Sequence, residues 1–63
     1  MTPKEEQQQL VEPMELIGKA MNRLDYLFKE TNYIVYETTT QRLSERLTHL
    51  QNHDKYLESC ELP

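Results

Sequence analysis

The chain has 63 residues, with eleven acidic and seven basic side chains and a formal net charge of −4 at pH 7. A chain of this length forms one domain at most and buries only about 60% of its unfolded surface, so it usually needs a disulfide, a metal or a partner. Cys60 is the single cysteine, which excludes an internal disulfide and is typical of a reducing cytoplasm. We find no leader pattern and no apolar run near eighteen residues, and the acidic balance argues against non-specific binding to nucleic-acid backbones.

Apolar residues in the first half of the chain recur at alternating steps of four and three, which is the heptad spacing of a helix with one buried face. Leu16, Ala20 and Leu27 widen this stripe on one side, and a wider stripe is typical of a helical bundle. The seam positions are Leu10, Met14, Ile17, Met21, Leu24 and Phe28.

Pro13 bears on where the first helix begins. Proline is tolerated in the first turn of a helix and disrupts an interior, so we predict a helix at about residues 12–30. Residues 1–11 are then expected to be frayed or disordered, although Thr2-Pro3-Lys4-Glu5 matches a capping box with proline at the first helical position.

The second half carries another heptad, out of phase with the first. Extending the first seam beyond Phe28 reaches mostly polar positions, so the phase breaks before Tyr36 and a turn is predicted near residues 30–32. The second helix is predicted at about 33–58. Its seam positions are Tyr36, Thr40, Leu43, Leu47, Leu50, Asp54 and Leu57.

The segment at residues 33–38 is rich in β-branched and aromatic side chains, which favour a strand. A strand needs a partner, and no other segment of the chain resembles one. We therefore favour a helix there and keep as the alternative a strand that pairs with its copy in a second chain.

Together these patterns predict an all-α antiparallel helical hairpin at residues 12–60, with 61–63 as a tail. Two helices cannot enclose a core, so we expect a homodimer in which two hairpins form a four-helix bundle. The apolar residues expected to form this core or dimer seam are Met14, Ile17, Met21, Leu24, Phe28, Tyr36, Leu43, Leu47, Leu50 and Leu57.

A stripe of basic and aromatic residues flanks the second seam and is the best candidate site. It could contact a protein partner, or RNA, or it could be only a solvated helix edge with pairs such as Glu45–His49. Tyr26, on the outer face of the first helix, is a further candidate partner contact. Lys19 and Arg23 add basic charge on the first helix for the nucleic-acid alternative. The stripe consists of Arg42, Arg46, His49, His53, Tyr56 and Cys60.

Catalytic and metal chemistry find little support in the sequence. His49 and His53 are four residues apart and could face one ion, but zinc needs three or four ligands and no further cluster is present. Cys60 has few neighbours that could lower its pKa, and no serine lies beside a plausible base. We expect no catalytic residue, no metal, no cofactor and no small-molecule substrate.

The chain, and MNRLDYLFKETNYIVYETTTQRLSERL in particular, resembles the small early proteins encoded between the exonuclease and excisionase genes of lambdoid bacteriophages. The resemblance covers most of the chain without a diagnostic motif. It implies a protein of the bacterial host cytoplasm that acts through partners, not as an enzyme, on the lysis–lysogeny choice or on host physiology. In architecture alone, the predicted hairpin is similar to plasmid Rop-type proteins, which are short acidic hairpins that dimerise and bind RNA.

The sequence therefore predicts a small non-enzymatic regulatory protein that binds itself and a host or phage protein, without membrane association. The alternative hypothesis is an RNA-binding hairpin dimer that uses Arg42, Arg46 and His49, with Lys19 and Arg23.

Overall fold

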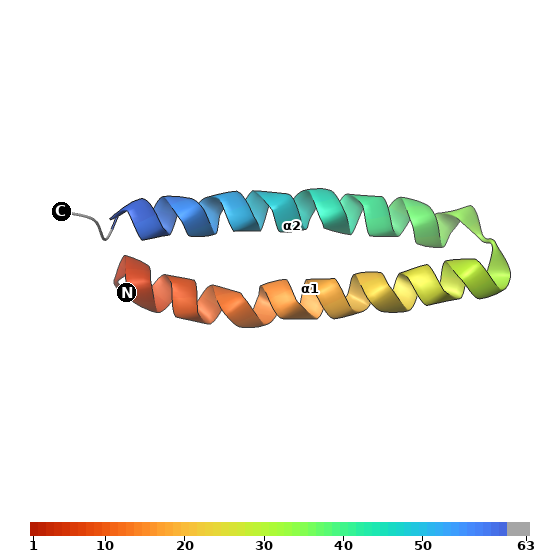
Figure 1. Ribbon diagram of the computed structural model, residues 1–63, viewed down its shortest axis with the longest axis horizontal. Coiled ribbons are helices and arrows are strands. Elements are labelled where there is room, and N and C mark those ends of the chain that lie inside the picture. Colours follow the sequence, from red (N-terminus) through yellow and green to blue (C-terminus); the bar gives the residue numbers. More distant parts are fainter. Residues whose placement is uncertain (61–63) are drawn as a thin grey trace.

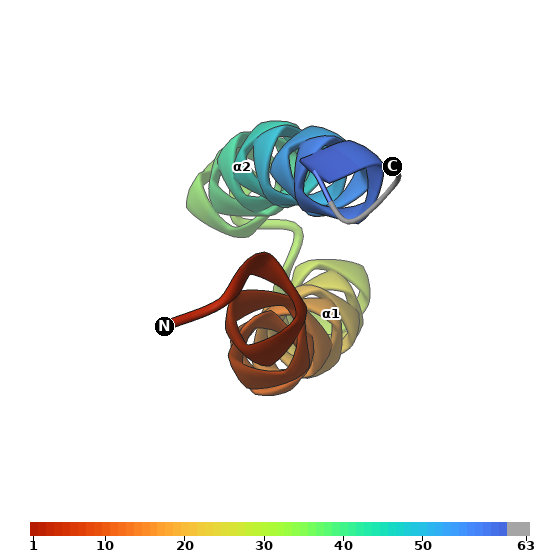
Figure 2. The same ribbon diagram turned by 90° about the vertical axis from the view of Figure 1, so that its left-hand side faces the viewer.

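The computed structural model describes residues 1–60, which form two long helices packed side by side in opposite directions. Helix α1 runs over Pro3–Thr31 and helix α2 over Ile34–Cys60 (Figure 1). The molecule is a rod with principal extents of 50 × 16 × 13 Å. Viewed along the rod, the two helices cross at a shallow angle (Figure 2). The prediction of an all-α antiparallel hairpin is confirmed, and residues 1–60 contain no strand.

Helix α1 begins at Pro3, so the predicted start near residue 12 is wrong. The capping box accounts for the early start. The Thr2 hydroxyl oxygen accepts a hydrogen bond from the Glu5 N–H at 3.2 Å and donates one to the Glu5 carboxylate, also at 3.2 Å. Pro13 lies inside the helix. Pro13 removes only one backbone hydrogen bond from the helix, and packing against α2 stabilises the helix on both sides of it.

The turn between the helices consists of Asn32 and Tyr33. Asn32 is left-handed (φ 60°, ψ 20°), and its N–H donates to the Phe28 carbonyl at 2.7 Å, which ends α1. The Thr31 hydroxyl donates to the Leu27 carbonyl at 2.7 Å and accepts from the Tyr33 N–H at 3.3 Å. These bonds pair the Asn32 and Tyr33 N–H groups and the Thr31 hydroxyl at the chain reversal, as is common at a helix end.

The segment that could have been a strand is helical from Ile34 onward, so the strand alternative is wrong. The hydroxyls of Thr39 and Thr40 donate to the carbonyls of Val35 and Tyr36, at 2.7 and 2.8 Å. Threonine can satisfy its hydroxyl in this way without leaving a helix. Packing against α1 overrides the local preference for a strand.

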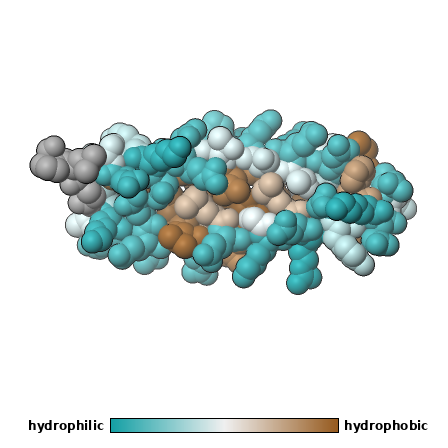
Figure 3. Space-filling view, viewed as in Figure 1, coloured by the Kyte–Doolittle hydropathy of each residue, from teal (hydrophilic) through white to brown (hydrophobic). Residues whose placement is uncertain are grey.

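Both predicted seams lie on the sides of the helices that are least exposed. All thirteen heptad positions, from Leu10 to Leu57, are at least partly shielded, but only Leu57 is buried, with 5% of its surface exposed. Figure 3 shows apolar surface along the line between the helices, bordered by hydrophilic side chains. The hairpin thus brings its seams together without enclosing them. Within residues 1–60 neither helix is long and apolar enough to cross a bilayer.

Candidate functional site

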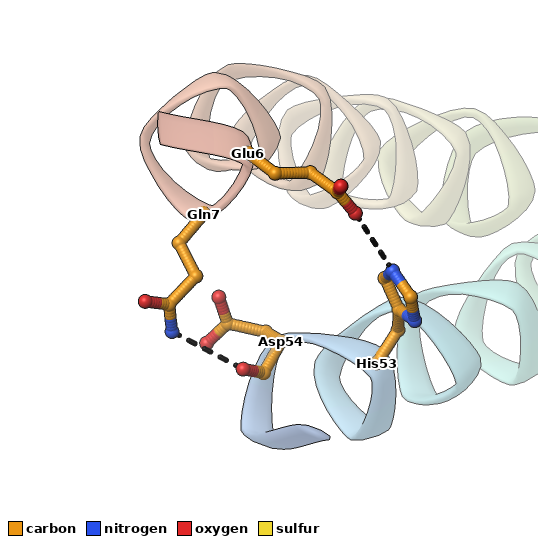
Figure 4. A network of polar contacts seen from close by, with 4 residues as sticks. All are labelled: Glu6, Gln7, His53 and Asp54. Carbon is orange, nitrogen blue, oxygen red and sulfur yellow. Dashed lines mark hydrogen bonds and ion pairs between the residues drawn. The ribbon is translucent and has the colours of Figure 1, made fainter. Parts of the chain in front are cut away.

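Two polar contacts at the open end of the hairpin fix how the helices face each other. A Glu6 carboxylate oxygen lies 3.0 Å from His53 Nε2, and the Gln7 amide donates to the Asp54 backbone carbonyl at 3.1 Å (Figure 4). In an antiparallel pair, each heptad step along α1 toward the turn matches an equal step back along α2. Residues seven apart stay on nearly one line of a helix. The Glu6–His53 contact therefore shows that the row through Glu6 and the row through His53 lie on the same side of the hairpin.

On α1 the row through Glu6 continues through Pro13, Ala20 and Leu27. On α2 the row through His53 runs back through Arg46 and Thr39. Pro13 accordingly lies across from Arg46 and Ala20 across from Thr39. One further row on each side completes this surface, with Leu16 and Arg23 on α1 and with Val35, Arg42 and His49 on α2.

We call this surface the arginine face. Between the open end and the turn it holds three of the chain's seven basic residues, a formal charge of +3, with Glu6 on its row at the open end and Glu30, seven residues after Arg23, on its row at the turn. The remaining four basic and eleven acidic residues give −7, and the whole chain gives −4. Glu45 lies on the next, outward row of α2. The arginine face consists of Pro13, Leu16, Ala20, Arg23, Leu27, Val35, Thr39, Arg42, Arg46 and His49.

The basic residues of the arginine face are open to solvent. Arg23, Arg42, Arg46 and His49 are all exposed, and within residues 1–60 none of them forms an ion pair or hydrogen bond through its side chain. An arginine that has no carboxylate partner keeps all five of its donors available for an external acceptor. The intrahelical pair between Glu45 and His49 that the sequence allowed is not formed.

His53 and Tyr56 are placed differently from the rest of the stripe. His53 contacts Glu6, and its ring stacks on Tyr56 with centroids 5.9 Å apart and an interplanar angle of 25°. The Cys60 side chain raises the pKa of Tyr56, first through a hydrogen bond and then through its charge, with a smaller contribution from burial. Of these residues His53 contacts α1, whereas Tyr56 and Cys60 interact within α2 and Tyr56 is 61% exposed, so their predicted contact with a partner stays a prediction.

The structure does not bring Lys19 or Tyr26 to this face. Both project from the outer side of α1, away from α2, about a quarter turn beyond the row of Ala20 and Leu27. Tyr26 is 63% exposed there. Arg23, the other basic residue predicted on the first helix, lies at the border of the arginine face. The predicted nucleic-acid set is thus divided between two surfaces.

Apolar side chains are the part of this face that sequence reasoning did not connect with binding. Leu16 is 56%, Leu27 38% and Val35 59% exposed, although all three are large and apolar. The sequence placed Leu16, Ala20 and Leu27 beside the first seam. Only the antiparallel register shows that they lie beside Arg42 and Arg46, and the heptad rows of the two helices are the signal that could have revealed it.

Exposed apolar residues also gather at the turn. Five of the nine large apolar side chains that are exposed among residues 1–60 lie within ten residues of sequence here: Tyr26, Leu27, Tyr33, Ile34 and Val35. The Tyr33 and Tyr36 rings are near each other, with centroids 6.3 Å apart. Clusters of exposed apolar side chains are a common mark of interaction sites. Leu27 and Val35 join this apolar turn to the arginine face.

Two features of the surface of residues 1–60 bear on the sequence expectations for pockets and metal ligands. This surface has no pocket, and no three His, Cys, Asp or Glu side chains of residues 1–60 are grouped so that they could hold a metal ion. His49 and His53 lie on adjacent rows of α2, and His53 is already engaged with Glu6. The arginine face is the candidate site because, within residues 1–60, exposed arginines without carboxylate partners border exposed apolar side chains there.

Comparison with protein-family models, with curated proteins and with solved structures finds no match for this chain.

Proposed function

We propose that this protein is a non-enzymatic binding protein that pairs with a second copy in a four-helix bundle and acts by holding a protein partner. One observation supports this most directly: Leu57 is the single buried apolar side chain among residues 1–60. A domain normally buries many such side chains, because hydrophobic burial must offset the conformational entropy lost on folding. The hairpin alone leaves that need unmet, and a second structure that covers its seam supplies the missing burial.

Charge favours one side of the hairpin for self-association. A two-fold dimer contact uses the same patch on both copies. Through the arginine face it would gather six arginines, with the carboxylates of Glu6 and Glu30 only at the two ends of the face, which is unfavourable. The opposite side carries both signs of charge, including the exposed pair between Asp25 and Lys29 at 3.1 Å. Gly18 also lies there, with open space where a side chain would project.

The test is the solution mass, measured by light scattering over at least a tenfold dilution. We expect about twice the 7.6 kDa chain mass. Gly18→Gln places a bulky side chain on the proposed interface and should give the monomer mass, although it raises helix propensity. Ala20→Gln is the matched control on the arginine face and should remain a dimer. A monomer for the natural chain at every concentration would refute the dimer, and a monomer for Ala20→Gln alone would place the interface on the arginine face.

A second candidate function is binding of structured RNA through Arg42, Arg46 and His49. The unpaired arginines of α2 support it, since guanidinium groups bind phosphate well. Its signature is a steep loss of affinity with salt, together with a loss on Arg42→Ala or Arg46→Ala. Binding to a protein through apolar contacts should depend on salt only modestly.

The biological setting follows from the resemblance to the small early proteins of lambdoid bacteriophages. On that basis we propose that the partner is a host or phage protein in the bacterial cytoplasm. Binding would then influence the lysis–lysogeny choice or host physiology. The experiment is to compare lysogenisation frequency in hosts that express the natural chain or an Arg42→Glu, Arg46→Glu double variant. Equal frequencies with both, and with no protein, would contradict the proposal.

A further inference from the structure

The arginine face combines an open apolar strip with basic side chains along both of its edges. We propose that it binds an acidic amphipathic helix of a partner protein, an inference that rests on the proposed function and names the class of partner. Arg23 borders the strip on the outer side of α1, and Arg42 and Arg46 border it on α2. The strip between them consists of Leu16, Ala20 and Leu27, and Val35 extends it toward the turn.

The dimensions of the strip match a helix. From Pro13 to Leu27 the surface of α1 extends about 21 Å at the usual rise per residue, which corresponds to about four turns of a partner helix. An amphipathic helix that lies along it can place its apolar stripe on Leu16, Ala20 and Leu27. Carboxylates on the two borders of that stripe then meet Arg23 on one side and Arg42 and Arg46 on the other. This is an apolar centre with a charged rim, the usual anatomy of a protein interface.

Charge selects this partner over the other candidates. A second copy of the chain would place its arginine face, with a formal charge of +3, against the same charge on the first copy. RNA would meet the three arginines but would leave the exposed leucines and Val35 without a role, and it would be repelled by the −7 on the rest of the chain. A helix with carboxylates beside apolar residues can contact both the arginines and the exposed apolar side chains of this face. Arginine and carboxylate can also pair through two parallel hydrogen bonds, which adds orientation to attraction.

The experiment uses fluorescence anisotropy with the full chain and labelled peptides of about eighteen residues, long enough for the four turns of the strip. One peptide repeats leucine at heptad positions with glutamate on the flanks. A second has the same leucines with lysine in place of glutamate, and a third keeps the composition of the first with its order scrambled. We expect the acidic amphipathic peptide to bind at least tenfold more tightly than either of the others.

Three charge-reversal variants identify the surface. Arg42→Glu combined with Arg46→Glu should weaken binding of the acidic peptide by about a hundredfold, on the basis of about tenfold for each charge-assisted pair lost. The same variant should bind the lysine peptide better than the natural chain does. Lys55→Glu is a single-reversal control on the opposite side of α2, to be compared with Arg42→Glu alone, and it should change the affinity less than twofold. Circular dichroism establishes that each variant retains its helices.

Several outcomes would overturn the inference. It is wrong if the acidic peptide binds no better than the scrambled one, or if Lys55→Glu weakens binding as much as Arg42→Glu. It is also wrong if a labelled RNA hairpin binds and competes while the peptide does not. The mass measurement separates this result from the proposed function, because a stable dimer that ignores the acidic peptide refutes the partner class alone. A chain that neither dimerises nor binds any peptide refutes both.

Discussion

Replacing Leu57 with alanine tests how the open end of the hairpin is held together. Leu57 lies one turn beyond His53 and therefore packs opposite the first turns of α1. With only 5% of its surface exposed, it is the best shielded apolar side chain in residues 1–60. Its burial requires that residues 3–11 are helical and packed, which is the point where the sequence prediction failed.

The cost of this substitution follows from the burial of the leucine. Burying a leucine side chain contributes about 1.5–3 kcal/mol, and Leu→Ala in a core costs about 2–5 kcal/mol when a cavity remains. Near the end of a hairpin the surroundings can close in, so we expect a loss of about 2–3 kcal/mol. A domain of this size has a total stability of about 3–9 kcal/mol. The melting temperature should fall by about 10–20 °C.

The assay is thermal and urea unfolding followed by circular dichroism, at one fixed protein concentration because oligomers melt in a concentration-dependent way. Leu16→Ala is the matched control, with the same chemical change at a side chain that is 56% exposed. It should cost less than about 1 kcal/mol. If Leu57→Ala cost as little as Leu16→Ala, the first turns of α1 would not be packed against α2, and the register deduced from Glu6 and His53 would lose its support.

Three further substitutions test the backbone and the end of α2. Asn32→Val should lower the free energy of unfolding by about 1–2 kcal/mol in urea because φ at Asn32 is 60°, whereas Asn32→Gly should stay within about 0.5 kcal/mol; equal values would contradict the left-handed turn. Pro13→Ala should raise the stability by up to about 3 kcal/mol, measured by thermal melting, since it restores a backbone hydrogen bond. Cys60→Ala should lower the pKa of Tyr56 toward its ordinary value in a tyrosinate absorbance titration, with Tyr56→Phe identifying the signal. A raised pKa in the folded chain means that this contact stabilises α2 below the ordinary tyrosine pKa and is lost as pH rises through the raised one, so an unchanged titration would refute the contact.

The heptad pattern was sufficient to predict the two helices and the sides on which they meet. Spacing of apolar residues reports directly which side of a helix is shielded. The start of α1 could not be predicted in the same way, because Pro13 and the Thr2–Glu5 cap give opposite signals. Their balance depends on whether Leu57 packs against the first turns, and that is a tertiary contact. The helix at residues 33–38 likewise depends on packing against α1 as well as on local preference.

The candidate site was predictable only in part for a related reason. The row of Arg42 and Arg46 is visible in one helix, as is the row of Leu16 and Leu27 in the other. Which rows share a side depends on the handedness and register of the antiparallel pair, and those follow from Glu6 and His53, which are 47 residues apart. The same geometry separates Lys19 from the arginines, although all are basic and all lie on helices.

The two-residue turn also has a consequence for how the chain folds. Residues on either side of Asn32 pair across a very short loop, whereas Glu6 and His53 pair across a loop with a sequence separation of 47. The entropic cost of closing a loop grows with its length. Pairing of the two helices is therefore easiest beside the turn and proceeds from there toward the open end. The Glu6–His53 contact would then form last and open first. Amide hydrogen exchange should accordingly be slowest near the turn-proximal seam at Leu24 and Tyr36 and fastest in the first turns of α1.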